Sequence, residues 1–328
     1  MTGTRGSRPG AARKKSSAGP VPQRRGEPVR AATPAAPPPR AVPPRRSGTR
    51  ITPVRRRTWW QSPTLIAGSL VIVVLLVGGF VAIALRQGSA VAADQVAPPA
   101  VVAALTQISP QVSSAVGTGG LPQPLKATPP TPILMGPSQK PEVLYIGAGY
   151  CPFCAAERWS LIMALGRFGT FTNLHLAQSS GTDVYPNTPT FTFYGSSYQS
   201  NYLDFESVEE TGQDQQTRLQ APTVAQQNLF NTYDTARYTT SPGGIPFLDL
   251  GNQFIEVSSG FSPQVLAGHS WQDITTALAN PKATTTQAIV GNANYLTAAL
   301  CRLTGGQPAT VCTAAPIPQI EQQLPAGH

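Results

Sequence analysis

The sequence VLYIGAGYCPFCAAERW, residues 143–159, joins an apolar run to two cysteines that are separated by two residues. Val143–Gly147 is short, apolar and partly β-branched, which predicts a buried strand. Cys154–Arg167 carries its apolar side chains on one broad stripe, which predicts a helix packed against the core. Cys151 and Cys154 therefore fall where a strand gives way to a helix.

This junction suits redox chemistry. Pro152 fits the first helical turn, because an N–H at that position has no acceptor within the helix and its absence costs nothing. The free N–H groups and partial positive charge of a helix start favour a thiolate, so we expect a lowered pKa for Cys151. A Cys151 thiolate can attack a disulfide, and Cys154, one turn along, can resolve the mixed disulfide. The pattern favours a redox pair.

Two other interpretations of the cysteine pair remain open. Half of a zinc site would need further ligands from distant residues, and His175 and His269 are isolated instead of standing in paired spacing. An inert structural bridge would leave the helix start and the Pro152-Phe153 dipeptide without a role.

The pattern of the remaining sequence predicts an α/β fold with a mixed sheet flanked by helices. We expect strands over residues 171–177, 190–194 and 202–208, the last two as a hairpin-like pair, and two further strands around a turn at Gly251-Asn252. We expect helices over residues 223–237, 271–278 and 285–303.

The basic residues are concentrated at the N-terminus. Residues 1–57 hold 15 of the 24 Lys and Arg and one acid, whereas the chain from Arg86 onward has a net charge of −5. The N-terminal stretch is rich in Pro, Arg, Gly, Ser and Ala, so we expect residues 1–60 to form a disordered cytoplasmic tail. No aromatic residues alternate with the arginines, so we expect no nucleic-acid partner.

A membrane anchor is expected next. Leu65–Leu85 is 21 residues without charge, about 30 Å as a helix and enough to cross a bilayer. Trp59, Trp60 and three arginines precede it, which places the N-terminus in the cytoplasm. We therefore expect a single span over residues 61–86 in the cell membrane and an extracytoplasmic remainder. A cleaved signal peptide is the alternative, because Ala90-Val91-Ala92 resembles a cleavage site.

The composition also suggests domain boundaries. Residues 87–139 are rich in Ala, Val, Pro and Gly, so we expect an extracytoplasmic linker there, with a short helix near residues 99–109. We expect the folded domain over residues 140–312, with an insertion at about 178–240, and a C-terminal tail over residues 313–328.

A second cysteine pair, Cys301 and Cys312, lies in CRLTGGQPATVC. All four cysteines follow the predicted span, in a compartment that tolerates disulfides. Gly305-Gly306 and Pro308 allow the chain to turn between the two, so we expect a structural disulfide. A second redox pair is the alternative, although the C-x-x-C spacing is missing.

Two stretches together, VLYIGAGYCPFCAAERW and the later GGIPFLDLGNQFIEVSSGF, resemble the thioredoxin superfamily. More narrowly, they resemble an uncharacterised family of membrane-anchored proteins with a thioredoxin-like domain and the motif CPFCAAERW. The resemblance covers roughly residues 140–312. It implies that Cys151 is the nucleophile and Cys154 the resolving cysteine. It also implies that Pro246, after Ile245, is a cis-proline that faces the pair and leaves the backbone before it free to pair with a substrate chain.

The sequence departs from the superfamily at one position. Six residues before the first cysteine, where a buried acid often accepts a proton, this chain has Tyr145. Glu157, one turn after Cys154, is the candidate proton acceptor, with a solvent-facing role as the alternative. Arg158 is interpreted as a charge that stabilises the thiolate or as a solvated ion-pair partner, and Glu209-Glu210 as a solvated acidic pair.

These features predict a membrane-tethered extracytoplasmic thiol–disulfide oxidoreductase. It would act on protein thiols and disulfides, exchange electrons with a membrane redox partner, and need neither an organic cofactor nor a metal. One alternative is a non-catalytic thioredoxin-like binding or scaffold module of the cell envelope. Another is a Cu(I) chaperone, which the scarcity of Met and His (3 each) disfavours. The expected substrate-binding residues are Tyr150, Pro152, Phe153, Ile245 and Pro246.

Overall fold

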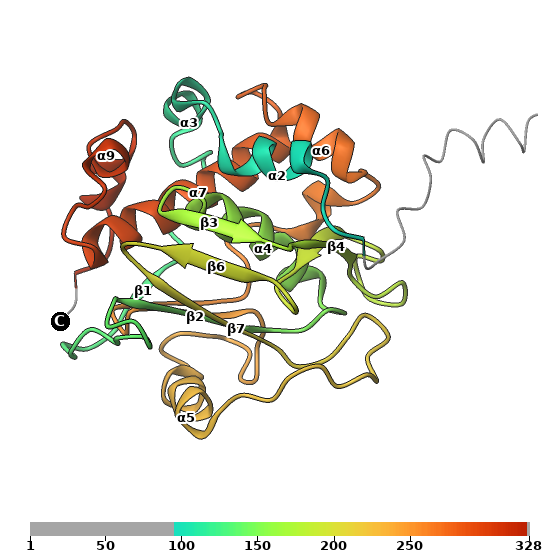
Figure 1. Cartoon of the computed structure of the whole chain (residues 1–328), viewed down its shortest axis with the longest axis horizontal. Helices are drawn as coiled ribbons and strands as arrows, with labels where there is room; N and C mark the ends of the chain where they lie inside the picture. Colours follow the sequence, from blue (N-terminus) through green and yellow to red (C-terminus); the bar gives the residue numbers. More distant parts are fainter. Residues whose placement is uncertain (1–94, 327–328) are drawn as a thin grey trace, which may run out of the picture. The chain divides into compact units, whose positions relative to one another are not determined.

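The computed structural model describes residues 95–326, which form a mixed α/β fold (Figure 1). Its main sheet has five strands in the order β1-β9-β8-β2-β7. Strand β2 pairs in parallel with β7 and antiparallel with β8, so the strand before the cysteine pair lies inside a mixed sheet. The expected mixed sheet is confirmed. The strands are β1 (Lys126–Ala127), β2 (Glu142–Gly147), β7 (Asp204–Glu209), β8 (Phe247–Leu250) and β9 (Phe254–Val257).

Helices cover both faces of this sheet (Figure 1). Helices α4 and α7 pack against each other on one face, and α5 lies on the other. The helices are α2 (Pro99–Thr106), α3 (Pro110–Val116), α4 (Pro152–Leu165), α5 (Val224–Tyr233), α6 (Trp271–Ala277), α7 (Thr284–Leu303), α8 (Ala309–Cys312) and α9 (Ile317–Glu321), with a 3₁₀ turn, η2, at Pro263–Leu266.

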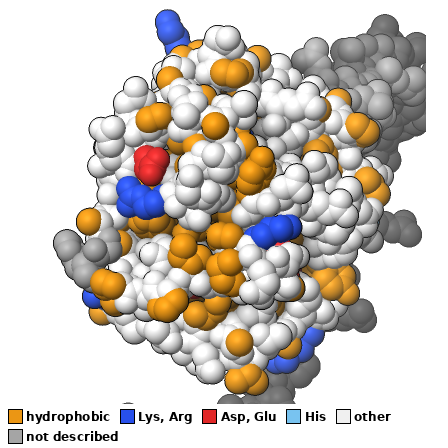
Figure 2. All heavy atoms as spheres, turned by 60° about the vertical axis from the view of Figure 1, so that its left-hand side comes forward, with side chains coloured by type: hydrophobic (Ala, Val, Ile, Leu, Met, Phe, Trp, Pro, Cys, Tyr) orange, Lys and Arg blue, Asp and Glu red, His pale blue; other side chains and the backbone are white. Residues whose placement is uncertain are grey.

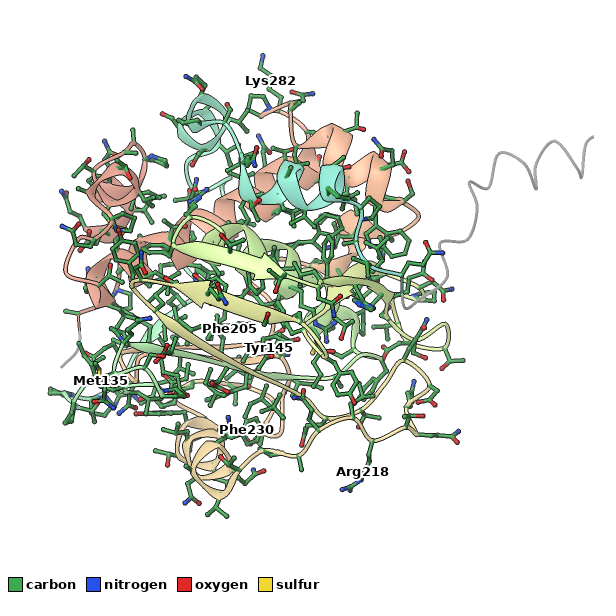
Figure 3. The ribbon with its side chains drawn as sticks, in the orientation of Figure 1. Met135, Tyr145, Phe205, Arg218, Phe230 and Lys282 are labelled. Carbon is green, nitrogen blue, oxygen red and sulfur yellow. A yellow bond between two sulfur atoms is a disulfide. The ribbon has the colours of Figure 1, made fainter. Side chains whose placement is uncertain are left out.

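The alternation of side chains along β2 divides the core into two clusters. Val143 and Tyr145 join the large cluster on the α4 side, whereas the neighbouring Leu144 joins the smaller cluster on the α5 side. Both faces are covered, which explains why β2 is a continuous apolar run. Figure 3 shows Tyr145 and Phe205 in the interior and Phe230 on the α5 side.

Two small sheets lie beside the main one. The expected strand over residues 171–177 is interrupted at Asn173, whose φ is +57°, so it forms two strands in different sheets. The expected pairing of residues 190–194 with 202–208 is wrong, because β5 pairs with β4 and β7 pairs with β2. The small sheets consist of β3 (Gly169–Thr172) with β6 (Ser197–Ser200), and of β4 (His175–Gln178) with β5 (Pro189–Thr192).

The hairpin of β8 and β9 turns at Gly251-Asn252, as the sequence predicted. Both residues have positive φ, 62° and 57°, which suits the right-handed twist of the flanking strands, and Gln253 N donates to Leu250 O at 3.0 Å across them. The backbone N–H of Asn252 donates to Asp249 Oδ1 at 2.6 Å and fixes the turn.

The folded region extends beyond the expected boundaries. The expected linker over residues 87–139 is wrong in its described part, because Val101 and Leu105 of α2 are buried in the core. Their spacing of four residues places both on the α4 side of α2. The expected tail after residue 312 contains α9, which packs on α7 and buries Ile317 and Ile320. The expected insertion at 178–240 contains β7, a strand of the main sheet.

The expected tail over residues 1–60 and the expected span over residues 61–86 lie outside the described residues. Between residues 95 and 326, no helix combines the length and the apolar character that crossing a bilayer requires.

The Cys301–Cys312 disulfide ties α8 to the end of α7, and both cysteines are buried. Replacing both with Ala is expected to lower the free energy of unfolding by roughly 3 kcal/mol, because the unfolded chain regains the entropy of an open loop. Urea denaturation measures this loss. Cys312→Ala alone should lose a similar amount, since either change opens the loop. A loss below about 1 kcal/mol in both variants would contradict the expectation.

Candidate redox site

Cys151 is the N-cap of α4 and follows the turn that leaves β2. Its Sγ accepts the backbone N–H of Cys154 at 3.2 Å, so the sulfur occupies the place that a capping oxygen takes in other helices. Pro152 is the first helical residue, as expected. Both cysteines are free thiols; Cys154 is fully buried and Cys151 keeps 6% of its surface exposed.

The two thiols differ in acidity. A hydrogen bond from the Cys154 side chain lowers the pKa of Cys151, assisted by the N–H groups of Cys154 and Phe153 and by the charge of Arg158, against the effect of burial. Burial raises the pKa of Cys154 well above its usual value, and the neighbouring Cys151 raises it further. Cys151 is therefore the thiol that ionises first and the better nucleophile of the two.

The loop before β8 faces the first cysteine. The Ile245–Pro246 peptide bond is cis, and the carbonyl oxygen of Ile245 lies 3.6 Å from Cys151 Sγ, although 94 positions separate them in sequence. Three of the expected substrate-binding residues, Tyr150, Phe153 and Ile245, are half-buried. The other two, Pro152 and Pro246, are buried.

Two loops that sequence reasoning did not connect with the cysteines border the cysteine turn. Gly149 N donates to Thr211 O at 2.7 Å, and Ser180 N donates to Tyr150 O at 2.8 Å. The Phe153 ring makes an edge-to-face contact with Tyr185, with ring centroids 6.1 Å apart. These loops lie inside the expected insertion. No spacing or motif in the sequence links them to the cysteines.

A buried ion pair lies beside the cysteines. Arg158 Nε lies 3.0 Å from Glu209 Oε1, and neither side chain is exposed. Arg158 Nη2 also donates to Ala148 O at 2.9 Å, and Glu209 accepts the N–H of Phe193 at 2.8 Å. The solvated interpretation of Arg158 and Glu209 is wrong. The burial of Arg158 could have been predicted from the sequence of α4, because apolar residues surround the first turns of this helix on nearly every side.

Tyr145, six residues before Cys151, is fully buried in the interior. Its hydroxyl is buried and has no hydrogen-bond partner among residues 95–326. The guanidinium carbon of Arg158 lies 5.6 Å from its ring centroid. Burial raises the pKa of Tyr145 well above its ordinary value, so this position carries no charge at neutral pH. The positive charge of Arg158, which is paired with Glu209, lowers the pKa of both cysteines.

Glu157 is buried, so its solvent-facing interpretation is wrong. Its Oε2 accepts from Asn292 Nδ2 at 2.9 Å and from Gly260 N at 3.3 Å. Burial raises the pKa of Glu157 to about 8, and burial also raises the pKa of its hydrogen-bonded neighbour Glu256 well above the usual range. The charge of Glu157 raises the pKa of Glu256 further. These contacts are with β9, α7 and a loop, and the role of Glu157 toward Cys154 stays a prediction.

The raised pKa of Glu157 makes stability depend on pH. Between about pH 4.5 and 8 the folded chain holds a proton that the unfolded chain has released, so the free energy of unfolding falls as pH rises. Each pKa unit corresponds to about 1.4 kcal/mol. Glu157→Gln is expected to flatten this decline in urea denaturation at pH 5, 6.5 and 8. Asp214→Asn, at an exposed turn, is the control that leaves the decline in place. An unchanged slope in Glu157→Gln would reject this account.

Within residues 95–326, no group of three or more His, Cys, Asp or Glu side chains is arranged to hold a metal ion.

The fold and the site define a mixed α/β protein with a dithiol at the start of a helix. Residues 131–302, more than half of the chain, match the family described as a domain of unknown function (DUF929), and the chain belongs to this family. No curated protein and no solved structure matches the chain.

Proposed function

We propose that this chain is a protein thiol–disulfide oxidoreductase with a thioredoxin-like catalytic domain. The observation that carries the proposal is the position of Cys151 Sγ, at the start of α4 and 3.6 Å from the carbonyl oxygen that precedes cis-Pro246. A C-x-x-C pair between a strand and a helix, facing a cis-proline that opens a later strand, is what the resemblance to thioredoxins implies. The topology from β2 through α4 to β8 supports the proposal.

The proposed reaction begins with attack of the Cys151 thiolate on one sulfur of a client disulfide. The client S–S bond breaks, a mixed disulfide forms, and the departing client thiolate takes up a proton. Cys154 then loses its proton and attacks Cys151 Sγ, which releases the second client thiol and leaves a Cys151–Cys154 disulfide. The client gains two electrons and the chain loses two. The reverse sequence places a disulfide in a client dithiol.

The surroundings of Cys151 suit an extended client. Tyr150, Phe153 and Ile245 keep exposed surface around a sulfur that is itself nearly buried. We expect a client backbone to run beside Ile245, where a neighbouring strand can pair with it. Pro246, which follows Ile245, is buried.

The proposed location is the outer side of the cell membrane. The uncharged stretch Leu65–Leu85, preceded by two tryptophans and three arginines, supports a single span with a cytoplasmic N-terminus. A membrane redox partner would return the cysteine pair to its starting state.

Alkylation kinetics of the reduced full chain test the proposal. The rate of iodoacetamide modification of Cys151 is expected to rise with pH at a midpoint below the ordinary cysteine value of about 8.5. The reduced chain is also expected to reduce a peptide disulfide at neutral pH. The urea-unfolded chain is the control, because it lacks the helix start and should show the ordinary midpoint. A midpoint at or above the control value, together with no exchange, would reject the proposal.

The small exposed fraction of Cys151, 6%, favours one second candidate, a non-catalytic binding module of the cell envelope. Such a module would hold an extended peptide in the same place without exchange. The Cys151→Ser/Cys154→Ser variant separates the two functions: full peptide affinity in the variant, with no exchange by the unmodified chain, would favour binding alone.

A further inference from the structure

A second candidate site lies at the opposite end of α4 from Cys151. A cavity of about 150 Å³ opens between α3, the segment around α8, and the first residue of α9. Its lining is mostly apolar: Ile108, Pro110, Ser113, Arg167, Thr310, Val311, Ala314, Ala315 and Ile317. Arg167 is the only charged residue in this lining. It follows the last turn of α4, about 20 Å along the helix from Cys151. On the face toward α9, hydrophobic side chains gather in a hollow and charged groups are few (Figure 2).

The guanidinium of Arg167 has unused hydrogen-bonding capacity. Nη1 donates to Thr297 Oγ1 at 2.6 Å, and Nη2 donates to Ser113 Oγ at 3.4 Å. Both hydroxyls donate their own protons elsewhere, to Ala293 O and Asn294 Oδ1. A guanidinium has five N–H donors, and three of those of Arg167 have no acceptor among residues 95–326.

Among residues 95–326, Arg167 has no carboxylate partner, unlike Arg158 with Glu209 and Arg302 with Glu321. Burial lowers the pKa of Arg167 to about 10, which leaves the side chain cationic at neutral pH. The carbonyl end of α4 offsets part of this charge. A partly buried cation without a carboxylate, in the wall of an apolar cavity, favours an anion with an apolar body.

We propose that this cavity binds a small apolar carboxylic acid, whose carboxylate pairs with Arg167. The planar guanidinium matches a carboxylate through two parallel hydrogen bonds. The apolar residues Ile108, Val311 and Ile317 surround the remainder of the ligand. A cavity of about 150 Å³ holds a molecule the size of benzene, so the ligand is an aromatic or short branched monocarboxylate. The Cys301–Cys312 disulfide holds the α8 wall in place.

Equilibrium dialysis of the full chain against radiolabelled benzoate tests this site. We expect saturable binding of one benzoate per chain. Unlabelled benzamide, which has the same shape without the charge, should compete about tenfold more weakly, because a charge-assisted pair is stronger than a neutral one. This comparison uses the unmodified chain and does not depend on the folding of any variant.

Two variants separate the polar and apolar halves of the site. Arg167→Gln is expected to weaken benzoate binding about tenfold and leave benzamide binding unchanged. Ala314→Leu fills the cavity and should weaken both. Cys151→Ser is the control with unchanged binding, so this proposal and the proposed redox function can fail separately.

Four results would overturn the proposal: no saturable benzoate binding, equal competition by benzamide and benzoate, unchanged benzoate affinity in Arg167→Gln or Ala314→Leu, or competition by inorganic phosphate as strong as that by benzoate. The last would show that Arg167 attracts any anion and that the apolar wall plays no part.

Discussion

Cys154→Ser is expected to trap a mixed disulfide between Cys151 and a client, whereas Cys151→Ser forms none. In the first variant the attacking sulfur remains and the resolving sulfur is missing, so the reaction stops at its intermediate. In the second the nucleophile itself is missing, and the rate of exchange with a peptide disulfide should fall by about three orders of magnitude or more. Non-reducing gels and mass spectrometry of the trapped species measure both outcomes.

Serine is a suitable replacement at position 151. Its hydroxyl can accept the N–H of Cys154 and cap α4 as the sulfur does, so loss of exchange would report on the chemistry and not on the fold. The Cys301→Ala/Cys312→Ala variant is the matched control, since it removes the other cysteine pair and should keep the exchange rate. Exchange that survives in Cys151→Ser, or a trapped client on Cys154, would contradict the assigned roles.

The cysteine turn could be predicted from the sequence because its determinants are local. The apolar run of β2, Pro152 at the first helical position and the apolar residues of α4 all act within about twenty residues. The turn at Gly251-Asn252 was predictable for the same reason, as its residues favour positive φ. Boundaries were less accurate, because Val101 and Leu105 belong to the core through the contacts of α2 with α4 and α6, which lie far from α2 in the sequence.

The charged part of the site could not be predicted in this way. Whether a charged side chain is buried depends on the partner that offsets its loss of hydration. Arg158 finds that partner at Glu209, 51 positions later, and Glu157 finds Glu256 on β9. Both pairs depend on the position of β7 or β9 in the sheet. The sequence around Arg158 or Glu157 does not show which strands will lie beside α4, so it does not predict these partners.

The ion pair between Arg158 and Glu209 is expected to matter for both stability and reactivity. Arg158→Met leaves the Glu209 carboxylate buried without its counter-charge, and the free energy of unfolding should fall by about 3–5 kcal/mol. Arg302→Met is the matched control. It breaks the half-exposed pair with Glu321, whose atoms lie 3.8 Å apart, and should cost about 1 kcal/mol or less. Urea denaturation of the two variants gives the comparison.

Reactivity distinguishes a role for Arg158 toward the thiolate from a purely structural one. The positive charge of Arg158 lowers the pKa of Cys151, so its removal should move the alkylation midpoint of Cys151 to higher pH and slow modification at neutral pH. Once the thiolate is fully formed, the rate should be unchanged. In Arg158→Met/Glu209→Gln the buried carboxylate is also neutralised, so part of the stability should be recovered. The alkylation midpoint of Cys151 should stay above that of the unmodified chain, because Arg158 acts on Cys151 directly. A midpoint that does not move in Arg158→Met, or a stability loss no larger than that of Arg302→Met, would show that this buried pair affects neither the thiolate nor the fold.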